Sequence, residues 1–112
     1  QGMNTMNTIT AKFANHHGYS DISPFEIVRV ISDKTIEVRH MNYTRDPNWK
    51  PEIIPGGFCG HCVNQNEQTY TYESVPDAPV FRIRDSKNGW KCADGNKFVL
   101  SDAPRRFYDY NF

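Results

Sequence analysis

Apolar and polar residues alternate on both sides of a short polar turn, and this pattern constrains the fold more than any other feature. Residues 25–31 and 35–41 are rich in β-branched side chains, and Ile36 and Val38 share one face of the second run. The polar residues 32–34 separate the two runs. A period of two residues on both sides of a turn predicts a β-hairpin.

The same alternation returns along the rest of the chain. Further strands are predicted at residues 67–74, 80–84, 90–92 and 97–101, with turns between them. No window shows the spacing of an amphipathic helix. The sequence therefore predicts an all-β fold, a small antiparallel barrel or sandwich of SH3-like type with five to seven short strands.

One long segment between the predicted strands is rich in proline and glycine. Pro47, Pro51, Pro55 and the pair Gly56-Gly57 lie between residues 42 and 60, where they exclude a helix and interrupt any central strand. Long irregular loops are uncommon in small domains, and many of them are functional. This loop is therefore the first candidate for a binding site.

The length of 112 residues corresponds to one domain. Residues 1–20 are polar and weakly patterned, so we interpret them as an N-terminal arm and residues 21–112 as the single β-rich domain. The dipeptide Gln1-Gly2 before Met3 has the form of a scar left by protease cleavage of an expression tag. Neither a signal peptide nor a membrane-spanning run is visible, which predicts a cytoplasmic protein.

Charge limits the classes of partner. Lys plus Arg and Asp plus Glu both number 13, so the net charge is zero, which argues against a strongly basic nucleic-acid binder. A local basic face is still compatible with a neutral total. The aromatic C-terminal residues 107–112 are too apolar to remain exposed to water, so we expect them to pack against other residues. Because such a surface needs to be buried, we also expect a homo-oligomer.

Three cysteines raise two questions of chemistry. Cys59-Gly60-His61-Cys62 has the form of a redox dithiol, but the strand and helix that normally flank it are missing. Cys59, Cys62 and Cys92 with one histidine make a conceivable zinc site, but Cys92 has no neighbouring cysteine. We therefore favour small, half-buried loop residues, and we expect no metal, no cofactor and no catalytic residue.

The ligand-binding prediction combines three side-chain types. His61, Asn64 and Gln65 offer imidazole and amide groups for the edges of bases and sugars, although amides of this kind also cap loop backbone. Guanidinium groups that fit phosphates come from Arg45, Arg105 and Arg106. Flat faces for stacking come from Trp49, Phe58 and Tyr108, which alternatively seal a barrel end or a subunit interface.

The chain also resembles a set of uncharacterised small proteins of phages and prophages. The resemblance begins near residue 20 and rests on the hairpin of residues 25–41 and on these further residues: Gly56-Gly57-Phe58, His61, Asn64-Gln65, Glu67-Gln68, Tyr70 and the ending Arg106-Phe107-Tyr108-Asp109-Tyr110-Asn111-Phe112. It carries over no catalytic residue. It implies expression in the cytoplasm of an infected bacterium, where such proteins act as host-takeover or counter-defence factors.

We therefore expect a non-enzymatic phage-type protein that binds and sequesters a small nucleotide-derived immune signal of the host. Three alternatives stay open. The chain is a protein-interaction module that inhibits a host enzyme, an SH3-like nucleic-acid-binding module, or an enzyme that cleaves nucleotides. The zero net charge makes nucleic acid the weaker choice.

Overall fold

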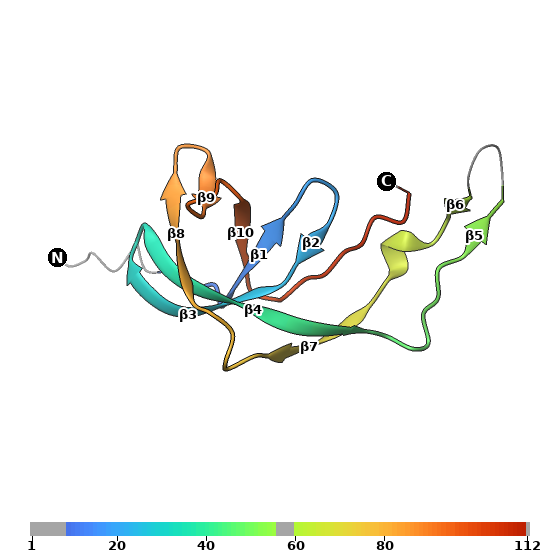
Figure 1. The fold of residues 1–112 in the computed structure, drawn as a ribbon, viewed down its shortest axis with the longest axis horizontal. Coiled ribbons are helices and arrows are strands. Elements are labelled where there is room, and N and C mark those ends of the chain that lie inside the picture. The colour runs from blue at the N-terminus through green and yellow to red at the C-terminus, as the bar shows by residue number, and fades with distance from the viewer. Residues whose placement is uncertain (1–8, 56–59, 112) are drawn as a thin grey trace.

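The computed structural model describes residues 9–55 and 60–111, and its strands form a barrel that continues into a long extension (Figure 1). The described residues contain no α-helix, and their single 3-10 helix, η2, spans Gln65–Glu67. Phe58 and the Gly56-Gly57 pair lie outside the described residues. The predicted all-β fold is confirmed.

Six antiparallel strands close the barrel. In spatial order they are β1 (Phe13–His17), β3 (Phe25–Ser32), β4 (Thr35–Arg45), β8 (Phe81–Ser86), β9 (Gly89–Lys91) and β10 (Lys97–Ser101). β10 pairs with β1 to complete the ring, and the short β2 (Ile22–Ser23) pairs with the free end of β1. A closed ring leaves few exposed strand edges, which are otherwise open to pairing with other chains.

The predicted hairpin of residues 25–41 is present as β3 and β4. Ile36 and Val38 of β4 point inward and are completely buried, and Ile83 of β8 lies directly opposite Ile36. Phe98 and Ala14 complete the core. Burial of apolar side chains at alternate positions of each strand stabilises this barrel, as the period-two pattern predicts.

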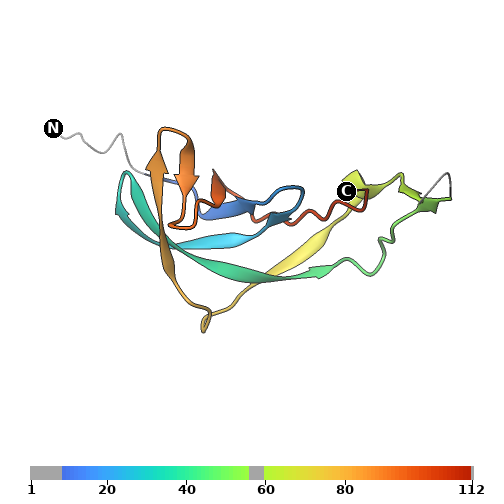
Figure 2. The same cartoon turned by 45° about the horizontal axis from the view of Figure 1, so that its top comes forward.

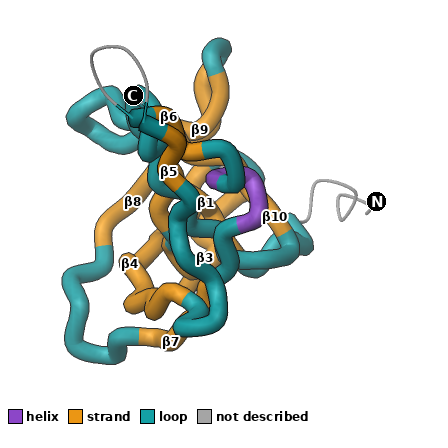
Figure 3. Tube along the Cα trace, turned by 90° about the vertical axis from the view of Figure 1, so that its right-hand side faces the viewer, coloured by secondary structure: helices purple, strands orange, loops and turns teal. Residues whose placement is uncertain are grey.

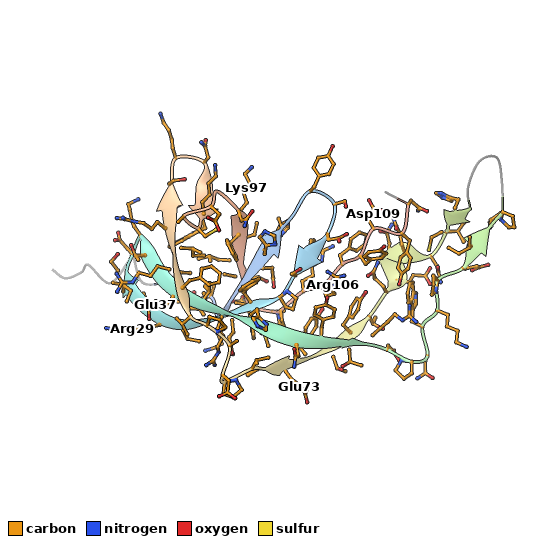
Figure 4. The ribbon with its side chains drawn as sticks, in the orientation of Figure 1. Arg29, Glu37, Glu73, Lys97, Arg106 and Asp109 are labelled. Carbon is orange, nitrogen blue, oxygen red and sulfur yellow. The ribbon has the colours of Figure 1, made fainter. Side chains whose placement is uncertain are left out.

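The outward positions of the hairpin are charged. Arg39 donates two hydrogen bonds to Oε2 of Glu26, from Nε at 3.0 Å and from Nη2 at 2.7 Å. Arg29 of β3 lies opposite Glu37 of β4, and Figure 4 shows both residues on the barrel.

The N-terminal boundary predicted from sequence needs correction. β1 lies within residues 1–20, so the β-rich domain begins before residue 21. Its alternation is hidden because the inward residue Ala14 is small and the outward residue Asn15 is polar yet 4% exposed. Asn15 is buried because its amide donates to the carbonyl of Ala103 at 3.0 Å and accepts from the backbone N–H of Arg105 at 2.9 Å.

The extension is built on the second half of β4, which continues to Arg45, beyond the strand end near residue 41 that the sequence predicts. This half pairs with β7 (Tyr70–Ser74), from Met41 opposite Ser74 to Arg45 opposite Tyr70. The hairpin of β5 (Ile53–Ile54) and β6 (His61–Cys62) stands at the far end of the extension, which faces the viewer in Figure 3. Residues 103–111, which we name the C-terminal segment, run from the barrel along the extension (Figure 2).

His17 of β1 gives the barrel a pH dependence. Burial lowers the pKa of this imidazole from its usual value, and the positive charge of Arg105 and the neighbouring His16 lower it further. Protonation is therefore less favourable in the folded state than in the unfolded state. We expect the free energy of unfolding to be highest above the ordinary histidine pKa of about 6.5 and to fall as the pH drops through the lower folded-state value.

Urea unfolding at about pH 7.5 and about pH 5 measures this effect. His17→Asn should reduce the difference between the two conditions, whereas His61→Asn, at an exposed position, should leave it unchanged. An equal pH difference in all three proteins would contradict the assignment.

Candidate functional site

Side chains from the barrel and the extension hold the backbone of the C-terminal segment. Asn15 fixes its start at Ala103 and Arg105. The next backbone N–H, that of Arg106, donates to the hydroxyl of Tyr72 at 2.8 Å. Phe107 forms a two-way backbone bridge with Ile22 of β2, with both N···O distances 2.9 Å. The segment therefore has one register against the rest of the chain.

Two glutamines also hold the backbone of the C-terminal segment. Gln68 accepts from the backbone N–H of Tyr108 at 2.9 Å and donates to its carbonyl at 2.8 Å. Gln65 accepts from the backbone N–H of Tyr110 at 2.8 Å. These bonds engage backbone groups of the segment, so they position the C-terminal aromatic residues through the main chain.

Arginines and aromatic rings alternate where the segment meets the extension. The Arg106 guanidinium carbon lies 4.7 Å from the ring centre of Tyr43 and 5.7 Å from that of Tyr108. Tyr108 and Tyr110 meet edge to face with their ring centres 4.7 Å apart. Cation–π contacts of this kind stabilise by about 0.5–1 kcal/mol each at exposed sites.

This series of arginines and aromatic rings ends at the proline-rich loop. Arg45 donates from Nη1 to the hydroxyl of Tyr110 at 3.1 Å, and its guanidinium carbon lies 5.7 Å from the centre of the Trp49 ring. Trp49 is buried and packs against Tyr110 at 5.7 Å. Tyr110 thus packs on Trp49, whereas Tyr108 remains 43% exposed and Phe112 lies outside the described residues.

A polar groove of about 490 Å³ lies between β7 and the C-terminal segment. Its walls are the aromatic residues Tyr70, Tyr72 and Phe107, the two cations Arg105 and Arg106, and polar residues from 66–69. We refer to this hollow as the polar groove. Figure 4 shows Arg106 between the C-terminal segment and the extension.

Arg106 is incompletely satisfied in this groove. Its Nε is buried and has no hydrogen-bond partner among the described residues. Its Nη1 reaches the carbonyl of Ile22 and the hydroxyl of Ser23 only at 3.5 Å. An unpaired buried donor costs about 1–3 kcal/mol, so Arg106 is held in this position at an energetic cost.

The two tyrosines of β7 are neutral at ordinary pH. Burial raises the pKa of Tyr70, with Tyr110 adding to the rise and Arg106 opposing it. Burial also raises the pKa of Tyr72, opposed by the backbone N–H of Arg106 and by the charge of Arg105. Both phenols therefore enter the groove as neutral hydrogen-bonding groups.

The structure brings some predicted site residues together and separates others. Arg105 and Arg106 line the polar groove, and Tyr108 lies against Arg106. Arg45 and Trp49 join the same cluster through Tyr110 but do not line the groove.

The loop residues of the prediction lie elsewhere. His61 is exposed on β6. Asn64 accepts from the backbone N–H of Glu52 at 2.7 Å and donates to the carbonyl of Lys50 at 2.8 Å. Asn64 and Gln65 thus perform the backbone capping that the alternative interpretation predicted. Phe58 is outside the described residues.

Sequence reasoning did not select Tyr70, Tyr72 and Phe107 as site residues. The sequence does indicate that Tyr70 and Tyr72 belong together, because alternation in β7 puts both rings on one face. In the structure this face lies toward the C-terminal segment. Phe107 had no local signal, since its place depends on the bridge to β2, far away in sequence.

The cysteines do not assemble into one site. Cys62 is buried on β6 at the end of the extension, while Cys92 follows β9 on the barrel, and Figure 1 shows these strands at different ends. Cys59 lies outside the described residues. Within residues 9–55 and 60–111, no three histidine, cysteine or carboxylate side chains gather closely enough to hold a metal ion.

Among the described residues, no helix has the length and apolar character needed to cross a bilayer. Comparison of the chain with protein-family models, with curated proteins and with solved structures finds no match. No function is therefore carried over from a matched protein.

Proposed function

We propose that the polar groove binds a small anionic ligand of nucleotide type and releases it unchanged. In keeping with the resemblance to phage proteins, the protein then acts in the infected bacterial cytoplasm by sequestering a nucleotide-derived immune signal. One observation carries the proposal: Arg105 and Arg106, two tyrosine rings and several amides line a single hollow of about 490 Å³. This volume is within the usual range for ligand sites.

Each side-chain type has a part in recognition. The guanidinium groups of Arg105 and Arg106 are suited to phosphate oxygens, since charge-assisted hydrogen bonds to a fork of donors are short and strong. Of the two, Arg105 is the more exposed. The rings of Tyr70 and Tyr72 offer faces for a base, and Asn66 offers an amide at the rim.

The lining favours binding over cleavage. The described residues that line the groove include no carboxylate, imidazole or thiol. General acid–base catalysis near neutral pH relies on such groups, and the raised pKa values of Tyr70 and Tyr72 make these phenols weaker acids. A ligand held here meets donors and flat surfaces but no proton-transfer partner suited to pH 7.

Calorimetric titration with a panel of cyclic nucleotides and ADP-ribose derivatives tests the proposal. We expect one member to bind, and chromatography of the recovered ligand should find it intact. Arg105→Ala should weaken binding about tenfold to a hundredfold, because it removes a charge-assisted contact of about 1.5–3 kcal/mol. The Arg105 side chain is exposed, so the fold should be kept.

Arg29→Ala is the matched control. This arginine is exposed on β3 and lies apart from Arg106 (Figure 4). It should bind the ligand as the wild type does. Absence of heat from every member of the panel, in a folded sample, would refute the proposal, and breakdown of the ligand would replace it with an enzymatic one.

A second function is favoured by the far end of the extension. Ile53 and Ile54 are each 51% exposed there, and Val63 is 46% exposed. Ile53 and Ile54 are successive residues of β5, so both faces of this hairpin carry an exposed apolar side chain. Exposed apolar side chains are typical of protein contacts. The expected homo-oligomer and an inhibited host enzyme are both compatible with this surface. Light scattering of the protein alone, compared with Ile53→Asp, separates self-association from a need for a host partner.

A further inference from the structure

The open end of the barrel carries a second hollow, which the proposed function does not use. It measures about 510 Å³ and is mainly apolar. Four of its lining residues are aromatic rings: His16 of β1, Phe25 of β3, Phe81 of β8 and Phe98 of β10. We refer to this hollow as the aromatic mouth.

The rings form a connected set. Phe25 meets Phe98 edge to face at 5.2 Å between ring centres and meets Phe81 in the same way at 5.7 Å. His16 lies 5.3 Å from Phe98. Strand alternation explains this arrangement, because Phe81 lies opposite Val38, and His16 lies opposite Phe98, on the inward face.

The mouth is the unfilled layer of the barrel interior. Deeper in, Ile83 and Val38 are completely buried, whereas Phe81 is 37% exposed although its position points inward. The edges of rings are therefore open to a molecule that enters the mouth. A volume of about 510 Å³ fits a small ring system.

Positive charge gathers beside the mouth. A third, smaller hollow of about 370 Å³ is lined by Arg82, Arg84 and Lys91, and it shares Arg82, Cys92 and Ala93 with the mouth. Arg84 lies directly opposite Lys91, and Lys91 lies directly opposite Lys97 on β10. Like charges at opposed positions destabilise a sheet, so a bound anion would relieve this repulsion.

Few carboxylates offset these cations. Arg82 pairs with Glu37 at 3.2 Å. In the described part of the chain, no carboxylate lies within 4.0 Å of the charged groups of Arg84, Lys91 or Lys97. Among the described residues that line the mouth, Asp94 is the one that is acidic.

We propose that the aromatic mouth binds an aromatic anion, meaning a flat ring system that bears one carboxylate, sulfonate or phosphate group. The rings of Phe25, Phe81 and Phe98 contact the flat body, and the anionic group lies toward Arg82, Arg84 and Lys91. This site is separate from the polar groove, and the two share no lining residue in the described part of the chain.

The probe for the test is 8-anilinonaphthalene-1-sulfonate, whose fluorescence rises in apolar surroundings. We expect binding with one probe per chain, accompanied by chemical-shift changes at the amides of Phe81 and Phe98. N-phenyl-1-naphthylamine, which has the same rings and no sulfonate, should bind about tenfold more weakly. Competition with decanoate distinguishes a ring system, which it should displace poorly, from an acyl chain.

Variants define the site. Arg84→Ala combined with Lys91→Ala should weaken probe binding about tenfold, because it removes two cations that face the sulfonate. Both side chains point outward and are not part of the core, so the fold should be kept. Asp94→Asn should strengthen it, and Arg105→Ala in the polar groove should leave it unchanged. Equal affinity of the charged and neutral probes, or a loss of binding in Arg105→Ala, would overturn the proposal and leave the polar groove proposal untouched.

Discussion

Replacing Ile83 by alanine is expected to lower the free energy of unfolding by about 3 kcal/mol, within the usual range of about 2–5 kcal/mol for such a change. Ile83 is completely buried and lies opposite Ile36, which is also completely buried. The cost combines the lost burial of three carbon atoms with the cavity that remains. A ring of paired strands cannot close easily around such a cavity, because every barrel strand is tied to two neighbours.

Urea unfolding followed by tryptophan fluorescence measures this loss. Ile83→Val removes one methylene group and should cost about 1 kcal/mol. Val99→Ala on the outer face of β10, where the side chain is 51% exposed, is the matched control and should cost less than either. Equal losses in Ile83→Ala and Val99→Ala would show that Ile83 is not central to the packing.

The strands that the sequence predicted are those whose pattern is local. The hairpin of β3 and β4 contains its own turn and its own alternation, so both strands can be found without the rest of the fold. β1 could not be found in this way. Its partner β10 lies 80 to 88 residues further along the chain. Its outer residue Asn15 is buried by the C-terminal segment, so a polar side chain occupies a covered position.

The site residues also divide into those that a local pattern predicts and those that depend on distant parts of the chain. Guanidinium groups next to aromatic rings were expected from composition, and Arg105 and Arg106 do line one groove. The amides of Asn64 and Gln65 were ambiguous in sequence, because ligand contact and backbone capping use the same atoms. For Asn64, the bonds to Glu52 and Lys50 show that it caps backbone. For Gln65, the answer depends on the position of the C-terminal segment, and that position is set by contacts between residues about 40 to 90 apart.

Replacing Gln68 by alanine is expected to release the end of the C-terminal segment. The Gln68 amide accepts from the N–H of Tyr108 and donates to its carbonyl, and it also accepts from the hydroxyl of Tyr70 at 2.6 Å. The amide also donates to the carbonyl of Gln65 at 2.8 Å. Loss of these four bonds removes a partner from each of these groups, and we expect a cost of about 1–3 kcal/mol in the free energy of unfolding. Hydrogen exchange should detect faster exchange at the amides of Tyr108 and Tyr110.

Two further variants make the test specific. Gln68→Glu keeps the acceptor for Tyr108 and removes the donor, so its amide exchange should lie between those of the wild type and Gln68→Ala. Glu67→Ala, exposed in the same 3-10 helix, should leave the exchange unchanged. Unchanged exchange in Gln68→Ala would mean that the other contacts of the segment hold it without the Gln68 amide.

The release of the segment also reaches the polar groove. Arg105, Arg106 and Phe107 all belong to the C-terminal segment, while Tyr70 and Tyr72 belong to β7, so the groove exists only while the segment is docked. A ligand that bridges both walls should therefore slow the amide exchange of Tyr108 in the wild type. In Gln68→Ala the same ligand should bind more weakly, because part of its binding free energy is spent on docking the segment. Equal affinity in the two proteins would place the ligand outside the groove.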